Sequence, residues 1–173
     1  MKYFIIFFVL ISTVACKKEV SIGVDQVTIV NDSTKITSED ISKITYLDFG
    51  VDGKAKNTLD SWQAYATVSA AIGKLKTANF EFFKTDDEEF NTILKDLEGT
   101  MPLTINSEPV QARVLVLRTK LLKLREAIYL ETIEKEDRLK AIKELFQAFS
   151  YVTLQVNKKF EKEAQNIIKP DSV

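Results

Sequence analysis

The sequence has no histidine, a single cysteine, five glycines and three prolines among its 173 residues. Without histidine the chain lacks the commonest general base and metal ligand, and a Ser-His-Asp triad is impossible. One cysteine cannot form a disulfide within the chain. Few glycines and prolines favour long helices, and no glycine-rich phosphate loop is present. The formal net charge of −1 lacks the basic excess typical of nucleic-acid binding, so we expect no nucleic-acid partner.

Residues 1–15 have the plan of a secretory signal peptide. Lys2 gives a positive start, and residues 3–11 (YFIIFFVLI) form an unbroken apolar run that ends in small residues. The apolar stretch up to residue 15 is shorter than the roughly 20 residues that a helix needs to span a bilayer. We therefore expect this segment to be cleaved.

The only cysteine follows the signal peptide directly, in Thr13-Val14-Ala15-Cys16. These four residues resemble the lipobox of bacterial lipoproteins, in which a peptidase cuts before a cysteine that carries diacylglycerol. Thr13 departs from the aliphatic residue that is usual at its position. The resemblance covers the first sixteen residues and implies that Cys16 is lipidated and holds the protein on a membrane. The alternatives are an ordinary thiol beside an ordinary signal peptide, or a buried apolar segment at residues 3–15.

The rest of the chain divides into a linker and a folded domain. Residues 16–37 contain the lipidated cysteine and then a segment without helical periodicity, which we expect to be a flexible linker. Residues 38–173 contain the apolar series that can form a core. A hydrophobic content of 45% and a charged content of 28% suit a soluble globular domain.

Two apolar series with steps of 3 and 4 residues predict two long helices after residue 107. The first follows the N-cap candidate Ser107 and the second ends before Pro170. The charged segment 131–138 (ETIEKEDR) separates them, which favours a hairpin. One continuous helix over 107–168 is the alternative, because Ile128 and Ile142 are fourteen residues apart and so keep the same heptad phase across the charged segment. The series are Val110, Val114, Leu117, Leu121, Leu124 and Ile128, then Ile142, Leu145, Phe149, Val152, Val156, Phe160, Ala164 and Ile167.

A third series predicts a long helix over residues 44–75, with a kink or break at Gly50 and Gly53. Thr85-Asp86-Asp87-Glu88 has the capping-box pattern and predicts a shorter helix that ends at Gly99. The predicted fold class is all-α: an up-and-down bundle of about four helices, three long and one short, after a signal peptide and flexible tether. The third series is Ile44, Leu47, Val51, Ala55, Leu59, Trp62, Tyr65, Val68, Ile72 and Leu75.

Two acidic segments are candidates for a cation site, and each has a simpler interpretation. Residues 48–53 (DFGVDG) are faintly similar to a calcium loop, but Gly50 has no side-chain ligand and Leu59 stands where a bidentate glutamate is needed. The acids Asp86, Asp87, Glu88 and Glu89 suit the positive end of a helix macrodipole. We therefore expect no metal site and no cofactor.

Arginines and aromatic residues give two further candidate groups. Arg113, Arg118 and Arg125 flank the apolar series of the helix after residue 107, where they either grip an anionic ligand or lay their stems along the core with their heads in water. Trp62 and Tyr65, one helical turn apart, either stack on a sugar or peptide or belong to the core. We favour the structural interpretation of both groups.

Short motifs near both ends of the domain carry two more resemblances. Asp32-Ser33-Thr34 and Asp171-Ser172-Val173 resemble an O-glycosylation pattern of exported bacterial proteins, so Ser33 and Ser172 are candidate modification sites. Val156-Asn157-Lys158-Lys159-Phe160 and Asn166-Ile167-Ile168-Lys169-Pro170 are similar to the C-terminal helix of uncharacterised helical lipoproteins of the bacterial envelope. This second resemblance implies a fold class and a location, and no activity.

These observations predict a non-enzymatic binding or scaffolding module of the cell envelope, anchored by lipid on Cys16. Lys17-Lys18-Glu19 is less acidic than surface-export signals of some lipoproteins, so we expect an outer-membrane protein that faces the periplasm. Its expected partner is an envelope protein or glycan. The alternative is a carboxylate- or metal-dependent envelope enzyme with its site between helices. An apolar groove favours the first, and buried acids that converge on one point favour the second.

Overall fold

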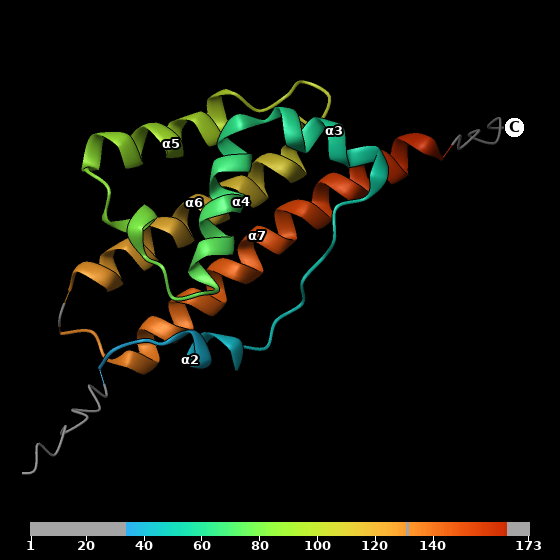
Figure 1. Ribbon diagram of the computed structural model, residues 1–173. Coiled ribbons are helices and arrows are strands. Elements are labelled where there is room, and N and C mark those ends of the chain that lie inside the picture. Colours follow the sequence, from blue (N-terminus) through green and yellow to red (C-terminus); the bar gives the residue numbers. More distant parts are fainter. Residues whose placement is uncertain (1–33, 131, 166–173) are drawn as a thin grey trace, which may run out of the picture. The chain divides into compact units, whose positions relative to one another are not determined.

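The structure, a computed structural model, describes residues 34–130 and 132–165. Within these ranges the chain forms α-helices and one 3-10 helix and no strand, so the predicted all-α bundle is confirmed (Figure 1). None of the helices in these ranges combines the length and the apolar composition needed to cross a bilayer. The elements are α2 (Ser38–Ser42), α3 (Gly53–Ser61), α4 (Gln63–Leu75), η1 (Glu81–Lys84), α5 (Asp87–Gly99), α6 (Glu108–Tyr129) and α7 (Lys135–Ala164).

α6 and α7 form the hairpin that the sequence favours, and one continuous helix is excluded. α6 ends at Tyr129, the backbone of its C-cap Leu130 is extended, and α7 begins after Glu134. Lys120 and Lys123 of α6 both reach the Glu144 carboxylate of α7, at 3.0 and 2.8 Å. The predicted apolar series face each other and are inaccessible to solvent at Val110, Val114, Leu117, Leu121, Leu124, Ile142, Leu145, Val152 and Val156.

The helix predicted over residues 44–75 is instead two helices, α3 and α4, preceded by extended chain. The predicted interruption near the two glycines is confirmed, since α3 begins at the second of them. Trp62 adds a second break, because its φ of −86° and ψ of 89° are not helical. The apolar series is buried within residues 55–75. Leu47 and Val51 continue the same apolar spacing but lie outside the core, since they are 64% and 44% exposed.

Residues 43–52, here called the extended segment, are bound to α7 by side-chain hydrogen bonds. Ser150 and Asn157 lie two turns apart on α7 and are 1% and 9% exposed. They satisfy three backbone groups that a helix would have satisfied internally. The bonds run from Phe49 N to Ser150 Oγ (2.8 Å), from Asp52 N to Asn157 Oδ1 (3.1 Å) and from Asn157 Nδ2 to Gly50 O (2.8 Å).

Two helix starts differ in detail from the sequence predictions. The N-cap of α5 is Asp86, whose carboxylate accepts from Glu89 N at 2.9 Å, and not the predicted Thr85. Thr85 instead donates its hydroxyl proton to Phe82 O at the end of η1. Ser107 does occupy the N-cap position of α6, although its hydroxyl makes no cap bond.

The sequence prediction also omitted α2. A complete capping box starts this helix, since Thr37 Oγ1 accepts from Asp40 N and the Asp40 carboxylate accepts from Thr37 N. Lys135 of α7 pairs with Asp40 at 2.8 Å and fixes α2 against the hairpin. Ile36 and Ile41 on either side of the cap are buried in the core. A short helix therefore forms here because tertiary contacts support it.

The hydrophobic core is drawn from residues 36–156, and Ser33–Val173 form one compact unit. Trp62, Phe83 and Phe90 are among the largest side chains that are fully buried in this core. Because all the core residues among those the structure describes belong to this unit, we expect residues 33–173 to fold without the preceding chain.

Candidate functional site

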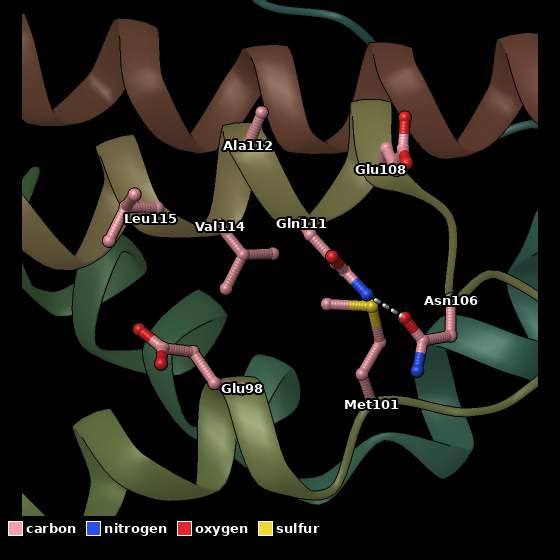
Figure 2. A pocket seen from close by; sticks show the side chains of 8 residues that line it. All are labelled: Glu98, Met101, Asn106, Glu108, Gln111, Ala112, Val114 and Leu115. Atoms are coloured by element: carbon pink, nitrogen blue, oxygen red, sulfur yellow. Dashed lines mark hydrogen bonds between the residues drawn. The ribbon is translucent and has the colours of Figure 1, made fainter.

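A pocket of about 510 Å³ lies where the C-terminal end of α5 meets the start of α6 (Figure 2). Its volume falls within the range typical of sites for small ligands or single side chains of a partner. Its walls come from α5, from the loop at residues 100–107 and from the first two turns of α6. The lining residues are Glu98, Met101, Asn106, Glu108, Gln111, Ala112, Val114 and Leu115.

The loop between α5 and α6 places the polar side of this pocket. Thr100 ends α5, and both its amide and its hydroxyl donate to Asp96 O. Ile105 and Asn106 donate their amides to Pro102 O at 3.0 and 3.1 Å, which closes a turn. The Ile105 side chain is fully buried and fixes this turn on the core. Asn106 is thereby held beside the first turn of α6.

The pocket combines an apolar floor with a bonded pair of amides. Met101 and Val114 are 7% and 0% exposed, and Leu115 is 54% exposed beside them. Gln111 Nε2 donates to Asn106 Oδ1 at 2.6 Å (Figure 2). This bond uses one donor and one acceptor, which leaves Asn106 Nδ2 as a donor and Gln111 Oε1 as an acceptor for a ligand. The pocket is therefore equipped to bind an apolar group attached to an amide.

The charged groups in the lining are two carboxylates. Figure 2 shows Glu98 of α5 and Glu108 of α6 on opposite sides of the pocket, so they do not converge on one point. Glu98 lies 3.5 Å from Arg118 Nη1, and their side chains are 47% and 40% exposed, so solvent weakens this ion pair. Glu108 is in the first turn of α6, where the helix dipole favours a negative charge. The rim therefore favours a cationic ligand.

The three arginines considered in the sequence do not meet at one ligand site. The Arg113 guanidinium lies 5.5 Å from the centre of the Tyr151 ring, and Arg118 pairs with Glu98. These two fit the interpretation in which arginine stems run beside the core. Arg125 differs, because it is only 8% exposed.

Arg125 connects α6 to the start of α5. Its Nη2 donates to Thr85 O at 2.7 Å and to Asp87 Oδ1 at 2.8 Å. Its guanidinium carbon lies 4.3 Å from the centre of the Phe90 ring. Nη1 is buried and has no hydrogen-bond partner among the residues that the structure describes. Since its contacts come from a backbone carbonyl, an acid and a ring, the side chain has a structural role.

Trp62 and Tyr65 belong to the core, as the structural interpretation predicts. They are 1% and 5% exposed, and their rings stack with centres 5.5 Å apart. Tyr65 stacks further on Phe149 at 5.0 Å. Its hydroxyl is bonded to Thr153 Oγ1 at 2.7 Å, and burial raises the pKa of this tyrosine. Neither ring is accessible to a sugar or a peptide.

The acidic segments serve structural contacts. Asp48, in residues 48–53, accepts from the Tyr46 hydroxyl at 2.9 Å and pairs with Lys76 at 3.2 Å. The acids at residues 86–89 form the N-cap and first turn of α5. Within residues 34–130 and 132–165 no group of three or more His, Cys, Asp or Glu side chains is placed to hold a metal ion.

Sequence reasoning did not find Met101, Asn106 or Gln111, which form the centre of the pocket. The only signal was negative: the apolar periodicity stops between Gly99 and Ser107. Cys16, Ser33 and Ser172 lie outside the described residues, so lipidation and glycosylation stay predictions. The chain matches no protein-family model, no curated protein and no solved structure.

Proposed function

We propose that this protein is a non-enzymatic binding module of the bacterial cell envelope, held on the periplasmic face of the outer membrane by lipid on Cys16. Its ligand is a peptide segment of an envelope partner, bound in the pocket between α5 and α6. The lipobox-like residues before Cys16 support the anchor. The observation that carries the binding function is the buried apolar floor beside the Asn106–Gln111 amide pair.

A peptide matches the chemistry of this pocket better than a glycan does. A free donor and a free acceptor on neighbouring amides complement the C=O and N–H of a peptide backbone. An apolar side chain of the peptide would contact Met101 and the exposed Leu115, and a lysine or arginine would lie near Glu98 or Glu108. Among the residues that the structure describes, none in the lining has an aromatic ring on which a sugar could stack.

Site-specific photo-cross-linking in intact cells tests this function. A photoreactive residue at position 115 should form an adduct with an envelope protein, whereas one at Lys158, exposed on α7, should form none. Ala112→Arg, which places a cation and extra volume in the pocket, should abolish the adduct at position 115. Equal adducts from both positions, or an adduct that survives Ala112→Arg, would contradict the assignment of the pocket.

The enzyme alternative is tested on the same residues. Purified protein would be assayed against peptide, glycan and phosphoester substrates, with Glu98→Gln/Glu108→Gln as the variant. The proposal expects no turnover above a buffer control. Turnover that is lost in this double variant, with folding unchanged by circular dichroism, would replace the binding module with a carboxylate-dependent enzyme.

A further inference from the structure

A second pocket, of about 520 Å³, lies at the end of the bundle where the described chain begins. Its walls come from the chain before α2, the segment after α4, η1, the last turn of α6 and the first turn of α7. Figure 1 shows α2 and the connection between α6 and α7 near this end. The lining residues are Lys35, Ile36, Ala78, Asn79, Phe80, Glu81, Lys84, Ile128 and Arg138.

Three cationic side chains and one carboxylate line this pocket. Lys35 and Lys84 are exposed, and neither has an ion-pair partner among the described residues. Arg138 Nε donates to Ile133 O at 2.8 Å, which holds the guanidinium at the pocket. The carboxylate of Glu81 accepts from Asn79 Nδ2 at 3.1 Å. The two unpaired ammonium groups make the pocket attractive to an anion.

The floor of this pocket is apolar, and exposed apolar residues continue beside it. Ile36 is 7% exposed, and Phe80 and Ile128 are half-buried against the core. The next residues of the chain, Tyr129 and Leu130, are 54% and 45% exposed. Tyrosine is enriched where membrane proteins meet the lipid headgroups, because its ring is apolar and its hydroxyl is polar. The site thus offers cations for an anionic head and apolar surface for the group attached to it.

We propose that this pocket binds the phosphate headgroup of an anionic membrane lipid. The choice of a membrane lipid as the ligand rests on the proposed function, in which Cys16 anchors the protein to a membrane. The 18 residues that lead from Cys16 to Thr34 span at most about 65 Å, and the pocket begins at Lys35. An anchored chain therefore keeps this pocket near headgroups, and the high local concentration makes even a weak site effective.

Vesicle co-sedimentation of residues 33–173 tests the proposal without the anchor. The protein should bind vesicles of phosphatidylglycerol and phosphatidylcholine and should not bind vesicles of phosphatidylcholine alone. Lys35→Gln/Lys84→Gln should weaken this binding by about 20- to 30-fold, since each cation at an anionic surface contributes roughly fivefold. Lys95→Gln/Lys158→Gln removes the same charge from exposed sites on α5 and α7 and should weaken it by less than about threefold.

Three results would overturn the proposal. The first is equal binding to both kinds of vesicle, and the second is an equal loss in the two double variants, which would reduce the effect to net charge. The third is a site for soluble phosphate, seen as NMR shifts at Lys35 and Lys84 with inorganic phosphate when vesicles do not bind. Circular dichroism of each variant checks folding. Because residue 16 is absent from this segment, the assay is independent of whether Cys16 is lipidated.

Discussion

Asn157 joins two parts of the chain that lie more than one hundred residues apart in sequence. Its amide accepts from Asp52 N and donates to Gly50 O, and the side chain is nearly buried. A buried amide is suited to this role because it supplies a donor and an acceptor at once. The Asp52 N–H and the Gly50 carbonyl belong to the extended segment at residues 43–52, so neither has an intrahelical hydrogen-bond partner that could replace Asn157.

Asn157→Asp tests the donor half of this contact. The carboxylate can still accept from Asp52 N, but it cannot donate to Gly50 O and would oppose that carbonyl. We expect a loss of about 1–3 kcal/mol in the free energy of unfolding by urea. Asn91→Asp makes the same chemical change at an exposed site on α5 and should cost less than about 0.5 kcal/mol. Equal costs would mean that the bonds of Asn157 are dispensable.

Asp40 should make stability depend on pH in the acid range. The hydrogen bond from Lys135, followed by those from Thr37, holds the pKa of Asp40 well below its ordinary value of 3.8. As pH falls below about 4, the unfolded chain therefore binds this proton before the folded chain does. The stabilisation by Asp40 is complete above the unfolded pKa and is lost as pH falls through the folded one.

Thermal unfolding measured from pH 7 to pH 2 checks this dependence. The difference in midpoint between the wild type and Asp40→Asn should be largest near neutral pH and should shrink below about pH 4. Lys135→Gln should flatten the same part of the curve, because it removes the largest cause of the shift. A constant difference across the whole range would show that Asp40 acts without its charge.

At the scale of elements, α6 carries two different apolar faces. The inner face contains Leu121, which is fully buried against α7, and the outer face contains Leu122, which is 41% exposed. Leu121→Ala should cost about 2–5 kcal/mol of unfolding free energy, since it removes buried methyl groups and leaves a cavity. Leu122→Ala should cost less than about 1 kcal/mol. A larger cost at Leu122 than at Leu121, measured by urea unfolding, would mean that the face of α6 that contains Leu122 is the buried one.

Sequence patterns predicted α6 and α7 well because their structure is specified locally. Leu117, Leu121 and Leu124 recur at helical spacing, and the same residues are fully buried in the core. Residues 43–52 carry a similar spacing, but Leu47 and Val51 end in solvent. There, distant side chains on α7 replaced the hydrogen bonds of a helix, and no local pattern reports such contacts.

The pockets were not predictable from sequence for a related reason. Met101 and Asn106 lie beside Gln111 only because the loop after α5 makes a turn. In this turn Pro102 O accepts hydrogen bonds from the amides of Ile105 and Asn106. Sequence reasoning does recognise helix faces, since these repeat along the chain. It does not recognise a concave site that depends on how loops and helix ends pack.

At the scale of the whole molecule, the proposed anchor gives a direct prediction. Cys16→Ala should move the protein from the membrane fraction into the soluble periplasmic fraction, because the acyl chains that anchor it would be missing. Immunoblotting of fractionated cells measures this, and the intact mass of the purified wild type should include the lipid. An unmodified Cys16, with cleavage elsewhere in the chain, would contradict the anchor.

The bonds between the extended segment and α7 also set the order in which the protein can fold. α6 and α7 are neighbours in sequence, so closing their hairpin costs little chain entropy and can occur early. Residues 43–52 find Ser150 and Asn157 only across more than one hundred residues, at 101 to 107 positions of separation. A ribosome or a translocation channel releases the early residues first, yet their partners emerge last. Residues 43–52 therefore cannot reach their native hydrogen bonds until α7 has formed.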